Sequence, residues 1–143
     1  MTAPVSAGRE PAKLFKEAKT FSSFSVDDLK RAQEFYGQML GLAVSGTPEG
    51  LELQTEGNSV FLYPKPNHTP ASFTVLNFTV ADIEAAVAEL EAAGIRLEHY
   101  DLPNLKTDER GIFRGHPGPL IAWFKDPAGN ILSVVQDRSS SAG

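Results

Sequence analysis

Two stretches of the chain show the same order of alternating and then helical apolar positions. Residues 21–42 read FSSFSVDDLKRAQEFYGQMLGL, and residues 75–95 read VLNFTVADIEAAVAELEAAGI. In each stretch an alternating segment, typical of a half-buried strand, ends near an Asp, after which apolar residues recur at helical spacing. Asp28 and Asp82 stand where a carboxylate accepts hydrogen bonds from the first N–H groups of a helix. The pattern therefore predicts a strand followed by a capped helix, twice.

Glycines and short apolar segments complete the two copies. Gly41 and Gly94 follow the helical patterns, at the position where a left-handed residue ends a helix. Strand-like segments come next, at residues 42–44, 51–54 and 59–63 in the first copy and at 96–100, part of 111–115, 120–124 and 131–135 in the second. Each copy therefore reads βαβββ. The predicted fold class is α+β, with about eight strands and two helices on the outer side.

The repeat also sets the domain boundaries. A single domain is predicted over residues 13–136, and both ends of the chain, 1–12 and 137–143, are polar or rich in small residues, so we expect flexible tails. Within the domain, the boundaries are module one at about 16–64, the Pro-rich connector PKPNHTPAS at 64–72 and module two at about 73–136. The N-terminal residues lack the apolar centre of a signal peptide.

Composition and charge narrow the classes of function. The 143 residues carry a formal net charge of -5, which gives no general attraction to nucleic acid or to anionic membranes. The chain has no cysteine, which excludes a disulfide, a thiolate zinc site and a cysteine nucleophile. Patterns for a phosphate-binding loop or a serine-hydrolase elbow are absent. We therefore expect a cytoplasmic protein without a nucleic-acid or membrane partner.

Alternation also assigns the repeated strands an apolar face and a mixed face. The apolar face, predicted to lie under the helices, carries Ser22, Phe24 and Val26 in the first copy and Leu76, Phe78 and Val80 in the second. The mixed face carries Phe21, Ser23 and Ser25, matched by Val75, Asn77 and Thr79. Such a face either turns toward water, as in many antiparallel sheets, or lines a concave ligand site.

The position of Ser133 helps to decide whether the mixed face turns toward water or lines a ligand site. It lies in DPAGNILSVVQ, where the turn residues 126–130 predict a β-hairpin. Ile131 and Val135 flank Ser133 on its own face of the second strand of this hairpin. A hydroxyl among apolar neighbours is typical of a ligand pocket, which favours the concave site.

Together these motifs resemble a known family. The repeated V-x-D-[LI] at a helix start, FYGQMLGL at the end of the first helix and FKDPAGNILSVVQ near the C-terminus are similar to the vicinal oxygen chelate superfamily. This superfamily includes glyoxalase I, bleomycin-resistance proteins, fosfomycin-resistance enzymes and extradiol dioxygenases. The resemblance covers residues 18–136. It implies two modules whose mixed sheet curls around a cup, and a homodimer, because relatives often form one cup from modules of two subunits.

The resemblance also implies where a metal would bind. Metal-dependent members carry His, Gln or Glu at positions that hold Phe21, Val75 and Ser133 in this chain, with a fourth position near Leu62. A phenyl ring, aliphatic groups and a neutral hydroxyl are not usual ligands of a divalent ion. We therefore predict no metal at these positions and no cofactor.

The first hypothesis for function is binding of a small apolar or aromatic organic molecule in the cup, in the manner of the antibiotic-sequestering proteins that the chain resembles. The predicted lining is Phe21, Ser23, Tyr63, Val75, Asn77, Trp123 and Ser133. A non-catalytic alternative, placed third, is a regulatory or structural dimer whose cup is filled by its own side chains.

The second hypothesis, and the alternative to small-molecule binding, is an enzyme of the lyase, isomerase or dioxygenase type. It would use a displaced metal or metal-free acid–base chemistry. The candidate catalytic residues are Arg114 and His116, which lie in a long segment between Tyr100 and Leu120 that is typical of a binding loop or of plain surface. His68 and His99 are interpreted as surface or loop residues without a catalytic task.

Overall fold

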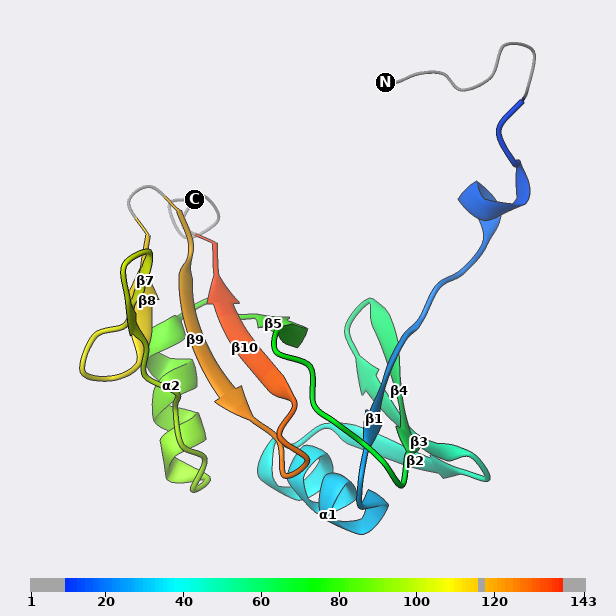
Figure 1. Ribbon diagram of the computed structural model, residues 1–143, viewed down its shortest axis with the longest axis horizontal. Coiled ribbons are helices and arrows are strands. Elements are labelled where there is room, and N and C mark those ends of the chain that lie inside the picture. Colours follow the sequence, from blue (N-terminus) through cyan, green and yellow to red (C-terminus); the bar gives the residue numbers. More distant parts are fainter. Residues whose placement is uncertain (1–9, 116–117, 138–143) are drawn as a thin grey trace.

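The computed structural model describes residues 10–115 and 118–137, where two four-stranded sheets have the same connectivity (Figure 1). The first sheet has the order β1-β4-β3-β2, and the second has the order β5-β10-β9-β8. The strands are β1 (Ser22–Val26), β2 (Ala43–Thr47), β3 (Gly50–Thr55), β4 (Asn58–Pro64), β5 (Thr74–Thr79), β8 (Ile112–Arg114), β9 (Leu120–Lys125) and β10 (Ile131–Gln136). In both sheets the first and last strands of the module pair in parallel. The predicted α+β repeat is confirmed.

Each module has one helix between its first and second strands, and both helices begin as predicted. α1 (Leu29–Gln33) is capped by Asp28, whose carboxylate accepts from the N–H of Arg31 at 3.2 Å. α2 (Ile83–Ala92) is capped by Asp82, which accepts from two N–H groups of its first turn. Gly41 and Gly94 follow with φ of 79° and 84°, a conformation that favours glycine. No helix in the described part of the chain is long and apolar enough to cross a membrane.

The first helix differs from the prediction after Gln33, where it continues as the π-helical segment η2 (Glu34–Met39). The N–H of Leu40 donates to the carbonyl of Phe35 at 2.9 Å, five residues back. This wider turn allows the neighbouring side chains of Phe35 and Tyr36 to be buried together. Met39, at the end of this segment, is 40% exposed.

The segment between α2 and β8 also differs from the prediction. Residues 96–100, predicted as a strand, contribute only an isolated bridge between Leu97 and Phe124. Instead, β6 (Asp101–Leu102) and β7 (Leu105–Lys106) form a small hairpin within the predicted loop. Two turn-forming residues, Pro and Asn, separate the strands, which explains where the chain reverses.

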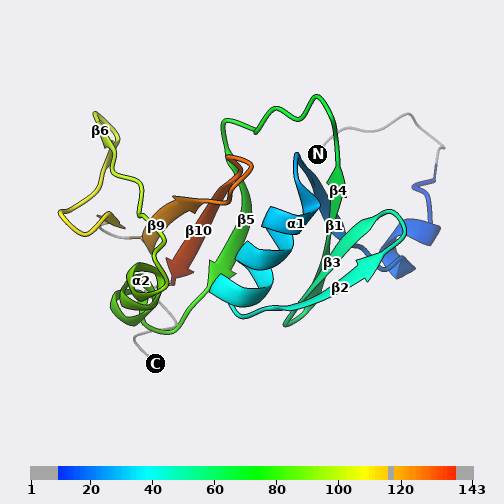
Figure 2. The same ribbon diagram turned by 90° about the horizontal axis from the view of Figure 1, so that it is seen from below.

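The two modules meet around α1, which lies between the sheets in Figure 2. The phenol of Tyr36 donates to Asp126 Oδ2 at 2.7 Å, and the rings of Phe35 and Phe124 lie 6.4 Å apart between centroids. One apolar core therefore continues across both modules. β1 and β5 are edge strands of separate sheets, and they do not pair with each other. Both sheets are curled, but the cup is therefore not closed within one chain.

Residues 10–21 form an arm that projects away from both sheets (Figure 1). The arm contains a single 3₁₀ turn, η1 (Leu14–Glu17), and none of the residues in this turn is buried. Leu14 and Phe15 are 68% and 70% exposed. We call this segment the N-terminal arm.

Candidate functional site

Ser133 and Asn77 form a hydrogen-bonded pair on the face of the second sheet that points away from α2, which we call its cup face. Ser133 is fully buried, and its Oγ lies 2.5 Å from Asn77 Oδ1. Because an amide oxygen only accepts, the hydroxyl donates, and the pair fixes the direction of the Asn77 amide. Asn77 itself is exposed, so its NH₂ group is left to donate to another molecule.

Trp123 lies beside this pair, opposite Ser133 in the register of β9 and β10. Its Nε1 donates to Thr74 Oγ1 at 3.1 Å, and the rings of Tyr100 and Phe113 pack against it at centroid distances of 5.4 and 6.3 Å. Burial, followed by the nearby Glu98 charge, raises the pKa of Tyr100, so this phenol stays protonated at neutral pH. The second cup face is therefore aromatic, with one oriented amide.

The first sheet contributes the remaining predicted cup residues. Ser23 and Tyr63 lie on the face of this sheet that points away from α1, its cup face, since Ser23 pairs with Phe61 and Ser25 with Tyr63. Phe21 comes directly before β1 and is 67% exposed. The seven predicted residues thus divide between two sheets.

A pocket of about 370 Å³ brings part of this set together, between β1 and the start of β5. Of the predicted residues it contains Ser23, Tyr63 and Val75, whereas Phe21, Asn77, Trp123 and Ser133 lie outside it. The full lining is Ser23, Phe24, Ser25, Tyr63, His68, Thr69, Ala71, Phe73, Thr74, Val75 and Asn130. We call it the connector pocket, because His68, Thr69 and Ala71 of the connector form one wall.

His68 makes two long-range hydrogen bonds in the connector pocket. Its Nδ1 lies 2.6 Å from Ser25 Oγ, and its Nε2 lies 3.0 Å from the carbonyl oxygen of Ala128. A carbonyl only accepts, so Nε2 must donate, and in the neutral ring Nδ1 then accepts from the Ser25 hydroxyl. A loop position was predicted for His68, but these contacts were not. They join residues 43 and 60 positions apart, for which no local sequence signal exists.

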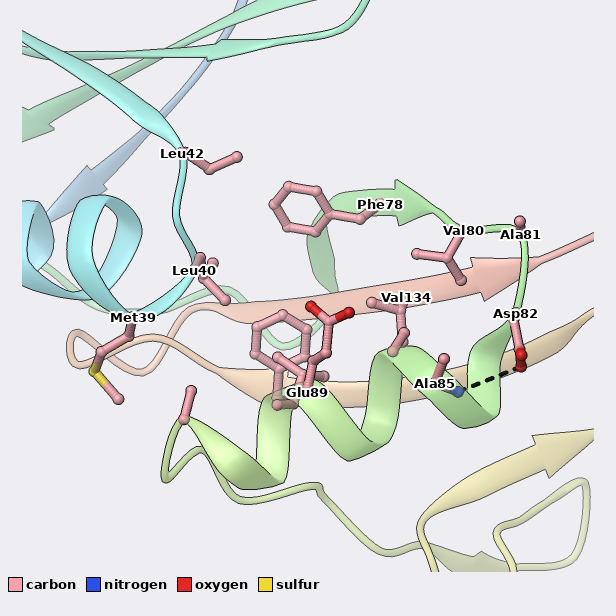
Figure 3. Close-up of a pocket in the computed structure, with 14 residues that line it drawn as sticks. Met39, Leu40, Leu42, Phe78, Val80, Ala81, Asp82, Ala85, Glu89 and Val134 are labelled. Carbon is pink, nitrogen blue, oxygen red and sulfur yellow. Dashed lines mark hydrogen bonds between the residues drawn. The ribbon is translucent and has the colours of Figure 1, made fainter.

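A second, more apolar groove lies on the other side of the second sheet (Figure 3). It has a volume of about 440 Å³ and lies between the end of the first helix and α2. Met39, Leu40 and Leu42 form one wall, Ala85 and Glu89 of α2 form the other, and Phe124 and Val134 are among the remaining lining residues. Sequence reasoning missed this groove. Its signal was the run of small alanines on α2, which leaves room beside the helix.

The candidate catalytic residue Arg114 lies on the α2 side of the second sheet. Its Nη2 contacts Glu84 Oε2 at 2.7 Å and Asp108 Oδ2 at 3.0 Å. The hydrogen bond that Arg114 donates to Glu84, more than the one it donates to Asp108, raises the pKa of Arg114. This pairing directs the guanidinium toward α2 and away from Asn77. His116, the other candidate, lies outside the described residues.

Asp108 is the second carboxylate paired with Arg114. Burial alone would raise the pKa of Asp108, but the N–H groups of Ile112 and Arg110 and the Arg114 guanidinium outweigh burial and lower it. Asp108 therefore remains a carboxylate at neutral pH. Glu84 also pairs with Arg110, at 2.8 Å, so it joins the two arginines. The cluster fixes β8 against α2.

The residues at the expected metal positions do not fit a divalent ion. Phe21 and Val75 have no donor atom in their side chains, and the hydroxyl of Ser133 is already bonded to an amide oxygen. The fourth position corresponds to Phe61 and not to Leu62, because Phe61 pairs with Ser23 as Ser133 pairs with Asn77. Among residues 10–115 and 118–137, no group of three or more His, Cys, Asp and Glu side chains is placed to hold a metal.

Comparisons with known proteins agree with this architecture. A family model described as Glyoxalase/Bleomycin resistance protein/Dioxygenase superfamily matches residues 21–134. A probable lactoylglutathione lyase from Vibrio cholerae is 29% identical over 126 residues, which cover 82% of this chain and 89% of that protein.

Two solved structures illustrate the likeness in fold. TnmS3, an antibiotic binding protein from Streptomyces sp. CB03234, superposes with a TM-score of 0.60 at 23% identity, over 84% of this chain and 97% of that one. A glyoxalase/bleomycin resistance protein/dioxygenase from Alicyclobacillus acidocaldarius gives a TM-score of 0.63 at 17% identity, over 83% and 91% of the two chains. The chain belongs to the glyoxalase/bleomycin resistance protein/dioxygenase superfamily.

Proposed function

We propose that this chain binds a small, largely apolar or aromatic organic molecule on its cup faces, without a metal at the usual family positions. The observation that carries the proposal is the oriented amide of Asn77 beside the aromatic side chain of Trp123. A few fixed polar groups among aromatic side chains are typical of small-molecule sites. The NH₂ group of Asn77 is suited to a carbonyl or another acceptor on the ligand.

Exposed aromatic side chains support the same proposal. Tyr63 and Phe73 line the connector pocket and are 37% and 67% exposed. Large apolar side chains grouped at a surface mark binding sites for ligands or partners. The fold likeness to TnmS3, described as an antibiotic binding protein, is consistent with a ligand of this kind.

The binding experiment uses Trp123, the only tryptophan in the chain, as its reporter. Small aromatic compounds that contain a carbonyl or amide are titrated while tryptophan emission is followed, and melting temperature is measured in parallel. A ligand at the cup face should change the emission saturably and raise Tm, because it binds the folded state alone. Failure of every compound in a broad set to do either would contradict the proposal.

Two variants locate the bound molecule. Asn77→Ala removes one hydrogen bond, worth about 0.5–1.5 kcal/mol, and should weaken binding by roughly two- to twelvefold. Ala85→Arg is the matched control, since it obstructs the apolar groove on the opposite side of the sheet and should leave affinity unchanged. If Ala85→Arg alone abolishes binding, the groove is the site and the cup proposal is wrong.

The proposed site is completed in a homodimer. The open edges of β1 and β5 leave backbone N–H and C=O groups free to pair with a second copy, which would bring the two cup faces together. Light scattering should therefore give about twice the chain mass of 15.4 kDa. Phe21→Asp, at an exposed residue next to β1, should shift the population to monomer. A wild-type mass of one chain at all concentrations would contradict the dimer.

The alternative is an enzyme, for which the name of the Vibrio cholerae relative is the specific support. An assay for turnover of lactoylglutathione, with and without added divalent metal, separates the two functions. We expect no turnover above the uncatalysed rate, because the usual metal positions do not fit an ion. Metal-dependent turnover that is lost in His116→Ala would favour the enzyme.

A further inference from the structure

Ser25 and His68 have the arrangement of a serine nucleophile and its base. The hydroxyl oxygen of Ser25 lies 2.6 Å from His68 Nδ1, within the distance needed for proton transfer. The other ring nitrogen donates to the Ala128 carbonyl at 3.0 Å, so the ring is held in orientation and tautomer by a third group. A nucleophile, a base and a group that orients the base are the parts that activate a serine.

This pair opens into a space of suitable size and lining. Ser25 and His68 both line the connector pocket, whose volume of about 370 Å³ lies within the range of small-molecule sites. Tyr63, Phe73 and Val75 supply an apolar wall, which suits an aromatic or short aliphatic group.

Two hydroxyl groups in the same pocket can stabilise negative charge. Thr74 Oγ1 acts as an acceptor toward Trp123 Nε1, which leaves its own proton available. Thr69 adds a second hydroxyl to the lining. Donors at the place where an oxyanion forms lower the barrier to acyl transfer.

We propose that Ser25 is an acyl-accepting nucleophile that hydrolyses small esters with an aromatic group, with His68 as general base. Ser25 Oγ bonds to the acyl carbon while His68 Nδ1 takes the hydroxyl proton. The C–O bond to the leaving alcohol then breaks, and the alcohol oxygen takes that proton. Water, deprotonated by the same nitrogen, releases the carboxylic acid and restores Ser25. The inference rests on the proposed function in one respect: the connector pocket is part of the same cup, and it must be able to bind an organic molecule.

The experiment combines covalent labelling with ester turnover on the full chain. The protein is treated with a fluorophosphonate probe and mapped by peptide mass spectrometry, and 4-nitrophenolate release from 4-nitrophenyl acetate is followed separately. A single adduct on Ser25 is expected. Ser25→Ala should abolish both signals, and His68→Gln should slow both by roughly a hundredfold, the contribution of a general base.

Ser22→Ala is the matched control, since Ser22 lies on the same strand with its side chain on the opposite face and should behave as wild type. His68→Gln also disturbs the connector, so Ser25→Ala, which leaves the contact of His68 with Ala128 in place, is the decisive variant. Absence of an adduct, an adduct on another residue, or labelling that persists in Ser25→Ala would each overturn the inference.

The two proposals fail separately. Saturable binding seen by Trp123 emission, without acylation of Ser25, would support the binding function and contradict the hydrolase proposal. Acylation of Ser25, with no ligand found in the emission screen, would support Ser25 as a nucleophile and contradict the proposed binding function.

Discussion

At the scale of single residues, Tyr36 joins the modules through one buried hydrogen bond to Asp126. Tyr36→Phe keeps the packing of the ring but removes the donor, which leaves a buried carboxylate with one partner fewer. We expect the free energy of unfolding to fall by about 1–3 kcal/mol, measured by chemical denaturation. Tyr100→Phe is the control, because the Tyr100 hydroxyl makes no hydrogen bond within the described part of the chain, and it should change stability by less than about 0.5 kcal/mol.

The same residue predicts a dependence of stability on alkaline pH. Burial, followed by the charge and hydrogen bond of Asp126, raises the pKa of Tyr36 above its ordinary value of 10.0. Below pH 10 Tyr36 keeps its proton in both the folded and the unfolded state, so its full contribution to the free energy of unfolding is present. As pH rises further, the unfolded chain releases the proton first, and stability should fall by about 1.4 kcal/mol per pH unit from this group. Tyr36→Phe should have a shallower slope above pH 10, and an equal slope would contradict this prediction.

A metal measurement tests the expectation drawn from Phe21, Val75 and Ser133. Protein purified without chelator should contain well below one equivalent of any divalent ion, as measured by plasma mass spectrometry. Added zinc or manganese should not raise Tm, because an ion bound by the native state would stabilise it. A stoichiometric ion that is lost in Asn77→Ala would contradict the prediction and place the metal at the cup face.

At the scale of secondary-structure elements, β3 and β4 approach each other closely at Gly50. A Cβ atom on Gly50 would lie 2.0 Å from the carbonyl oxygen of Leu62, and backbone there cannot move without breaking the pairing of the strands. Gly50→Ala should therefore lower the free energy of unfolding by about 3 kcal/mol or more. Gly46→Ala, on the adjacent strand with nothing within 4 Å, is the matched control and should cost about 1 kcal/mol or less. Equal losses in the two variants would contradict the steric explanation.

Comparison of the predicted and observed helices and strands shows which features of the structure can be predicted from sequence. The caps at Asp28 and Asp82 and the left-handed glycines depend on a few adjacent residues, so the pattern predicts them correctly. The π-helical segment was not predicted, because it depends on burying Phe35 and Tyr36 against two sheets at once. The contacts of His68 were missed for the same reason: its partners lie on β1 and in the 126–130 turn, far away in sequence. The alternation of Ser23, Asn77 and Ser133 indicated a shared face, but only the register pairs Ser133 with Asn77.

At the scale of the whole molecule, the N-terminal arm stands apart from the two modules. Lys13, Lys16 and Lys19 are exposed in it, and residues 10–20 contain no buried side chain. Proteases cut first where the backbone is exposed and little is packed against it. Brief treatment with trypsin should therefore remove the arm and leave a stable product that begins at Thr20, identified by intact mass. Initial cleavage at Lys106, which is exposed in the β6–β7 hairpin, with the arm protected, would indicate that the arm is covered in solution.

Because the two sheets have the same strand order, equivalent positions in the two modules can be compared within one chain. Each substitution in one module has a structurally equivalent substitution in the other, such as Asp28→Ala and Asp82→Ala at the two helix starts. Both members of a pair share one chain, one buffer and one unfolded state. A difference between them therefore measures the effect of local surroundings on a single type of interaction, a comparison that normally requires two separate proteins.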